Sequence, residues 1–180
     1  PVEEFRIVPV RVHLFRAESA PAIGVTLKPS DIDRIFRKAN NIWHAAGIHL
    51  WVESIVEEEP ARIYDPHISS LGSVDELLPL RHLKNRNKEM FHVYYVGKMG
   101  VNGIFIGQDA VFVQQAANLL PVEGGIDEPL PRVTSHELGH GLGLNHRQDR
   151  TNLMASGTTG TSLNEGEIAT SRQTAFSSPW

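Results

Sequence analysis

The chain has 180 residues, 41% of them hydrophobic and 21% charged, and it carries a formal net charge of −4 at pH 7. This is ordinary globular composition, and the length predicts one domain over residues 1–180 that can bury a substantial core. The acidic balance argues against a nucleic-acid partner, which normally needs a basic surface, and no apolar run reaches the roughly 18 residues of a membrane span.

The first part of the chain predicts a strand, a helix and a second strand. Residues 5–15 alternate between apolar and polar side chains over much of their length, as a half-buried strand does. Apolar residues then recur at helical spacing over residues 30–46, and a glycine follows. A second strand is predicted over residues 48–55. Trp43 of the helix and Trp51 of the strand are expected to pack in the core.

The middle of the chain predicts short elements separated by loops. Residues 57–72 are rich in turn formers and predict a surface loop. A capping-box pattern at Ser73–Glu76 predicts a short helix that runs to about Leu83. Residues 91–96 combine aromatic and β-branched side chains and predict a third strand. One or two further strands are predicted between residues 104 and 113.

The last third of the chain predicts two helices. Residues 118–131 contain prolines and paired glycines and predict a loop, after which Arg132 is expected to begin a helix. A second capping-box pattern at Ser162–Glu165 predicts a final helix to about Phe176. The order of the elements predicts an α/β (α+β) fold, in which one mixed sheet packs against long helices.

The helix expected from Arg132 carries the sequence His136-Glu137-Leu138-Gly139-His140. Histidines four residues apart project from the same face of a helix, and imidazole nitrogens are ligands that zinc prefers. Glu137 lies beside the first histidine and can flank a metal without binding it. That is the position that a general base for an attacking water requires.

A third histidine follows after a predicted turn. Gly143 is expected to adopt a left-handed conformation that ends the helix, because glycine does so without steric cost. The turn would allow His146 to return to the first two histidines as a third ligand. Three protein ligands leave one position for water, which is typical of catalytic zinc, whereas structural zinc is usually bound by four. The sequence therefore predicts one catalytic zinc.

The pattern His136-Glu137-x-x-His140-x-x-Gly143-x-x-His146 matches the signature of the metzincin clan of zinc endopeptidases, which this chain resembles. Met154 follows the third histidine as the methionine turn of the clan does, at a spacing similar to that of the matrixins. The resemblance implies that Met154 forms a hydrophobic floor under the histidines and that Glu137 is the general base. It also implies a single catalytic domain with a twisted mixed sheet, an active-site helix and a protein or peptide substrate.

The resemblance further implies that the substrate lies against an antiparallel edge strand within Ile104–Val113. Residues 107–113 lack the histidine with which matrixins bind a second zinc, so one zinc is expected. Ser156 stands where some metzincins have a tyrosine ligand, so the site is expected to hold three histidines and water. The match in sequence is strong over about residues 132–154, and over the rest of the chain only the predicted order of the elements matches.

Other candidate ligands are weaker. Asp127 and Glu128 lie beside paired glycines, but they lack the spaced oxygen ligands of a calcium loop, so calcium is possible without being indicated. The remaining histidines are expected to be surface residues or satisfied core residues. They are His13, His44, His49, His67, His82 and His92.

Two alternatives to a peptidase remain at this level. A metal-binding or peptide-binding module could keep the fold without catalysis, although an intact Glu137 argues against it. A metallohydrolase of small amides or esters could use the same motif. The chain has no cysteine, which is compatible with secretion and with the cytoplasm, and Pro1–Glu4 show no signal-peptide character. We predict a secreted or extracytoplasmic monomer.

Overall fold

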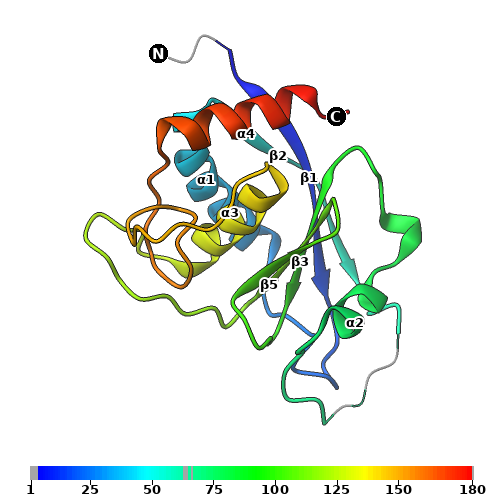
Figure 1. The fold of residues 1–180 in the computed structure, drawn as a ribbon. Coiled ribbons are helices and arrows are strands. Elements are labelled where there is room, and N and C mark those ends of the chain that lie inside the picture. Colours follow the sequence, from blue (N-terminus) through cyan, green and yellow to red (C-terminus); the bar gives the residue numbers. More distant parts are fainter. Residues whose placement is uncertain (1–3, 63–64, 66, 180) are drawn as a thin grey trace.

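One mixed five-stranded sheet lies against a layer of helices (Figure 1) in the computed structural model, which describes residues 4–62, 65 and 67–179. The sheet has the strand order β2-β1-β3-β5-β4, in which β4 alone runs antiparallel to its neighbour. The predicted combination of a mixed sheet and long helices is therefore confirmed. The strands and α-helices are β1 (Arg6–Phe15), α1 (Pro29–Trp43), β2 (Ile48–Glu58), α2 (Val74–Leu77), β3 (Phe91–Val96), β4 (Gly103–Ile106), β5 (Ala110–Gln114), α3 (Pro129–Gly141) and α4 (Glu165–Ser177).

Strand β1 runs between β2 and β3. It pairs with β2 along its whole length but with β3 only from Val10 to Leu14. Pro9, which has no N–H to donate, therefore lies where β1 has a single neighbour. Strand β2 continues to Glu58, three residues beyond the predicted end, because Phe15 of β1 still pairs with Glu58. The predicted loop at 57–72 begins correspondingly later, and its residues 63–64 and 66 lie outside the described part of the chain.

The short helix predicted from Ser73 to about Leu83 is wrong in its length. Its cap is present, since the Glu76 carboxylate accepts a hydrogen bond from the Ser73 N–H at 2.9 Å. The α-helix nevertheless ends at Leu77 and is followed by two separate 3₁₀ turns. Pro79 explains the early end, because proline lacks the N–H that an α-helical ladder needs at that position.

The main hydrophobic core lies between the sheet and the two helices α1 and α3, which run over the same face (Figure 1). Trp43, at the end of α1, is fully buried there, as predicted. A 3₁₀ turn follows α1, and Gly47, with a φ of +62°, ends it. The helical segment therefore ends at the glycine that the sequence indicated. Helix α4 crosses the start of β1 and packs on the 3₁₀ turn His44–Ala46, which follows α1 (Figure 1).

A second, smaller cluster covers part of the opposite face of the sheet. It combines aromatic side chains of the strands with apolar residues of the connecting segments. The expected packing of Trp51 in the core is wrong, because 51% of this residue is exposed. Its neighbour Leu50 faces α1, and successive strand residues point to opposite faces, so Trp51 points to the side that α1 does not cover.

Two of the scattered histidines form a buried polar network with Glu58. His13 Nδ1 lies 2.6 Å from the Glu58 carboxylate, and His13 Nε2 lies 2.9 Å from His92 Nδ1. The N–H of Asn87 reaches His92 Nε2 at 3.1 Å. Burial lowers the pKa of both imidazoles, that of His92 to about 4, so both are neutral at pH 7. These are satisfied core histidines, as expected from the sequence.

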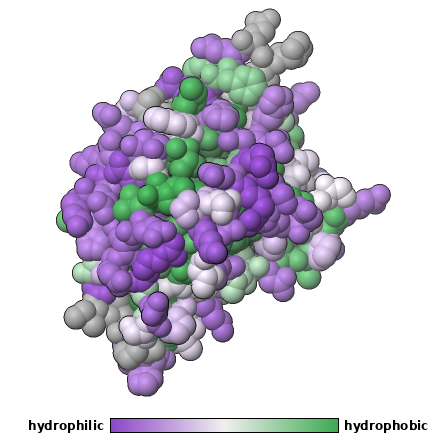
Figure 2. Space-filling view, turned by 180° about the vertical axis from the view of Figure 1, so that it is seen from behind, coloured by the Kyte–Doolittle hydropathy of each residue, from purple (hydrophilic) through white to green (hydrophobic). Residues whose placement is uncertain are grey.

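The face turned away from the viewer in Figure 1 is largely hydrophilic, and apolar side chains reach the surface there in a limited area (Figure 2). Among the described residues, no helix has both the length and the apolar character that crossing a membrane requires. The longest helix, α1, has 15 residues and a polar outer face.

Candidate metal centre

Helix α3 begins three residues earlier than predicted, at Pro129 rather than Arg132. Prolines in the first turn are compatible with a helix, since the first N–H groups have no acceptor within it. The helix ends at Gly141, and Gly143 then has a φ of +86°. The Leu144 N–H reaches back to the Gly139 carbonyl at 2.9 Å. The chain therefore reverses directly after the second histidine of the motif.

The reversal brings His146 to the two histidines of α3. His146 Nε2 lies 3.3 Å from His136 Nε2 and 3.1 Å from His140 Nε2. Within the described residues these three histidines are the one group of at least three side chains that could hold a metal. Ligands 2.0–2.1 Å from a tetrahedral zinc lie about 3.3 Å apart. The three nitrogens thus have the spacing of zinc ligands.

The protons of the helical histidines lie on the far side of each ring. His136 Nδ1 lies 2.8 Å from the Leu153 carbonyl, and His140 Nδ1 lies 2.9 Å from the Leu144 carbonyl. A carbonyl only accepts, so Nδ1 donates and Nε2 keeps its lone pair. The Nε2 lone pairs of these two histidines therefore face the centre of the triad, which is the arrangement that a bound cation satisfies.

Burial also favours the neutral, ligating form of these imidazoles. Burial, together with a smaller effect of the Arg132 guanidinium, lowers the pKa of His136 to about 3. Burial lowers the pKa of His140 in the same way. Both imidazoles are therefore neutral at pH 7, with the proton on Nδ1, and a metal need not displace a proton from Nε2.

Met154 lies beneath the helix that carries the first two histidines. It is fully buried, and its sulfur would be 2.7 Å from a Cβ added to Gly139. The Met154 side chain therefore packs directly against the backbone of α3 at Gly139. Its own N–H donates to the Asn152 side chain at 2.7 Å. The preceding residue, Leu153, supplies the carbonyl that orients His136. The turn that carries Met154 therefore supports the triad from below.

Glu137, the residue after His136 on α3, points toward β4 and away from Met154. The residue is 6% exposed, and burial raises its pKa to about 7, against the opposing effects of Arg132 and of the Phe105 N–H. A Cβ at Gly103 would lie 2.7 Å from Glu137 Cγ. Only a residue without a side chain allows β4 to pass so close to this carboxylate.

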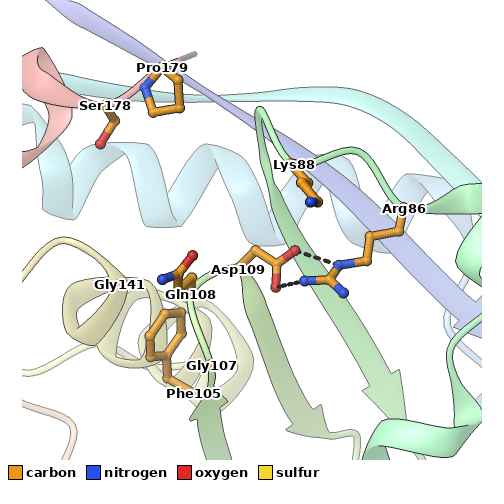
Figure 3. A pocket seen from close by; sticks show the side chains of 9 residues that line it. All are labelled: Arg86, Lys88, Phe105, Gly107, Gln108, Asp109, Gly141, Ser178 and Pro179. Atoms are coloured by element: carbon orange, nitrogen blue, oxygen red, sulfur yellow. Dashed lines mark hydrogen bonds and ion pairs between the residues drawn. The ribbon is translucent and has the colours of Figure 1, made fainter.

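Three pockets follow one another along β4. One of about 370 Å³ lies at the start of the strand and is lined by Val101, Gly103 and His136, among others. A second, of about 400 Å³, is lined by His140, His146 and Glu137. The third, of about 610 Å³, lies beyond Phe105, where Lys88 and the paired side chains of Arg86 and Asp109 face the space (Figure 3). The metal site thus lies in the middle of a row of pockets.

The edge strand is shorter than the segment that the sequence indicated. Within Ile104–Val113, only β4 lies at the edge and runs antiparallel, whereas β5 is an interior strand parallel to β3. Ser156 lines the first pocket. Asp127 and Glu128 are engaged in ion pairs with Lys38.

Arg132 and Glu167 are two buried charged residues near the centre that the sequence reasoning missed, each 1% exposed. Arg132 donates to the carbonyls of Gly160 and Ala155, and so ties α3 to the chain around Met154. Its position four residues before His136, on the same helix face, was a signal that it lies near the metal ligands. Glu167 could have been noticed as the third residue after Asn164, a capping box that overrides the predicted one at Ser162–Glu165.

No protein-family model matches the sequence, and no curated protein matches it. The fold is nevertheless similar to solved structures. Mirolysin in complex with a compound aligns with a TM-score of 0.67 and 11% identity, over 95% of this chain and 91% of that one. Metalloproteinase-II from Bacteroides fragilis aligns with a TM-score of 0.58 and 12% identity, over 97% of this chain and 55% of that one. Archaemetzincin from Methanopyrus kandleri aligns with a TM-score of 0.55 and 18% identity, over 96% and 88%. These similarities confirm the predicted metzincin-like fold.

The geometry predicts that zinc binding depends on His146 as much as on the helical pair. Dialysed wild-type protein should retain close to one zinc per chain by elemental analysis, and less at acid pH, where protons compete for the imidazoles. His146→Ala should lose tight binding, while His49→Ala, at an exposed histidine of β2, should keep it. Zinc retained by His146→Ala would indicate a different third ligand, such as a carboxylate.

Proposed function

We propose that the protein is a zinc-dependent endopeptidase of the metzincin type, with one zinc held by His136, His140 and His146 and with Glu137 as the general base. The observation that carries the proposal is the position of these side chains along the open edge strand β4, at the centre of a row of three pockets. The likeness in fold to a metalloproteinase and an archaemetzincin supports it.

A polypeptide is the substrate that suits an open edge strand. The Gln114 N–H donates to the Asn102 carbonyl, so the alternation of an antiparallel ladder turns Ile104 toward β5 and leaves the backbone groups of Gly103 and the Phe105 carbonyl facing outward. The Phe105 N–H also faces outward, and it donates to Glu137. An extended peptide can pair with such groups and place alternate side chains in the pockets. A small amide or ester would use one pocket and leave this edge without a partner.

Glu137 is suited to move the protons of hydrolysis. Zinc bound by the histidines would supply a Lewis acid that polarises the scissile carbonyl and makes the attacking water more acidic. Glu137 accepts a proton from that water and passes it to the leaving amine. Burial raises the pKa of this carboxyl group, which favours the uptake of a proton. Gly103 and the Phe105 N–H hold it beside the strand on which the substrate would lie.

Two finer predictions from the sequence accompany this proposal. We propose that residues 1–180 form one catalytic domain and that the chain acts as a monomer. The secreted or extracytoplasmic location stays a prediction. The binding-module alternative differs from the peptidase in one testable respect, the need for a proton acceptor at Glu137.

Replacement of Glu137 distinguishes catalysis from binding. Glu137→Gln should keep the fold and the zinc, because Glu137 is not a ligand, and should lower kcat by at least about 10²–10⁴-fold, the usual contribution of a general base. KM should change little by comparison, since the pockets and the strand remain. Glu165→Gln, at an exposed carboxylate of α4, should behave as wild type. Peptide hydrolysis by Glu137→Gln at the wild-type rate would exclude the proposed base.

Replacement of Gly103 tests the contact between β4 and the base. A methyl group there would lie 2.7 Å from Val133 Cγ1 and from Glu137 Cγ, so either the strand or the carboxylate must move. Gly103→Ala should therefore lower kcat/KM by about 100-fold, the cost of a displacement near 1 Å, with zinc retained. Gly100→Ala is the matched control, because its methyl group would meet only the Leu71 carbonyl at 3.9 Å. Unchanged kcat and KM in folded Gly103→Ala would argue against β4 as the substrate strand.

A further inference from the structure

The third histidine of the triad is held less directly than the other two. His136 and His140 each donate from Nδ1 to a backbone carbonyl, of Leu153 and Leu144 respectively. Among the described residues, no such hydrogen bond fixes Nδ1 of His146, whose polar contacts are those with the other two rings. His146 also lies on an exposed loop outside any helix or strand. Its position must therefore be fixed by its neighbours in the chain.

Arg147, the next residue, is anchored at two points. Its N–H donates to the Met154 carbonyl at 3.0 Å, which joins the loop of His146 to the turn under the triad. Its guanidinium Nε donates to Glu167 Oε1 at 2.7 Å. Glu167 belongs to the first turn of α4, so this contact connects the third ligand to the C-terminal helix.

The other carboxylate oxygen of Glu167 holds the methionine turn and caps α4. Oε2 accepts hydrogen bonds from the Asn152 side chain at 2.7 Å and from the Asn164 N–H at 2.9 Å. Asn152 in turn accepts the Met154 N–H at 2.7 Å. A capping box alone needs only the contact with Asn164 and can form at an exposed position, whereas Glu167 is 1% exposed and bridges three segments.

We propose that Glu167 is a positioning residue of the metal centre: through Arg147 and Asn152 it holds His146 and the turn of Met154 where zinc needs them. This inference rests on the metal site of the proposed function, but not on its catalytic activity. It assigns α4, which contributes no ligand, a role in metal retention. Partners that orient zinc ligands typically change metal affinity by about 10–100-fold when they are removed.

The two oxygens of Glu167 have separate roles, which makes Glu167→Gln a selective probe. A glutamine can present its carbonyl oxygen to Asn152 and Asn164, so that the cap of α4 and the contact with the methionine turn persist. Its amide NH₂ group would then face Arg147, which is also a donor, and this contact would be lost. Arg147→Gln removes the same contact from a residue whose side chain is 48% exposed, where folding should tolerate the change.

Zinc affinity and dissociation rate, measured by competition with a chelator, test the proposal without reference to peptide hydrolysis. Glu167→Gln and Arg147→Gln should each weaken zinc binding by about 10–100-fold and speed zinc loss. They should also alter the visible spectrum of the Co²⁺-substituted protein, which reports ligand geometry. Glu165→Gln, on the same helix turn but exposed, should change none of these quantities.

A purely structural role for Glu167 gives a different result. It would lower the melting temperature of the metal-free and zinc-loaded forms equally and leave zinc affinity and the Co²⁺ spectrum of the folded protein unchanged. That outcome, at a temperature where the metal-free variants are folded, would overturn the proposal. Normal zinc binding by the wild type without peptide hydrolysis would instead count against the proposed peptidase activity alone.

Discussion

The histidine triad depends on one geometric constraint: a helix can direct two histidines four residues apart at the same point, but it cannot direct the third histidine of this motif there. The third ligand has to return from outside the helix. The left-handed Gly143 reverses the chain at the end of α3, and this brings His146 to within 3.1–3.3 Å of the other two ring nitrogens. The remaining contacts around the site serve to hold that reversed segment against the helix.

Two buried charged residues, one on α3 and one on α4, make many of these contacts. Arg132 of α3 donates to the backbone carbonyls of Ala155 and Gly160, which follow Met154, and Glu167 of α4 accepts from Arg147 and Asn152, which precede it. A buried charge that loses its hydrogen-bond partners is strongly destabilising. Movement of the segments that Arg132 and Glu167 bind would therefore cost free energy, and this keeps the segments in place. The three histidines, the turn of Met154 and the C-terminal helix thus form one connected polar framework beside the apolar core.

The sequence was most informative where structure follows from local spacing. The ligand helix, its end at Gly141 and the positive φ of Gly143 follow from residues within a few positions of one another. A few boundaries were missed for local reasons, such as Pro79 at the end of the short helix, but the larger failures involve contacts between distant segments. Strand β2 extends to Glu58 because β1 pairs with it, and Trp51 is exposed because its side of the sheet is uncovered. The close passage of Gly103 over Glu137, and the bridge from Glu167 to Arg147, likewise join residues 20 or more positions apart, which no local pattern reveals.

The central claim is that this zinc site hydrolyses peptide bonds within a chain laid along β4. The most direct test is digestion of a mixed peptide library by the zinc-loaded protein, with the products identified by mass spectrometry. We expect cleavage at internal peptide bonds, loss of cleavage when the metal is removed, and recovery when zinc is restored. An intact library in the presence of protein that carries one zinc per chain would contradict the claim, and hydrolysis confined to small amides or esters would contradict the choice of substrate.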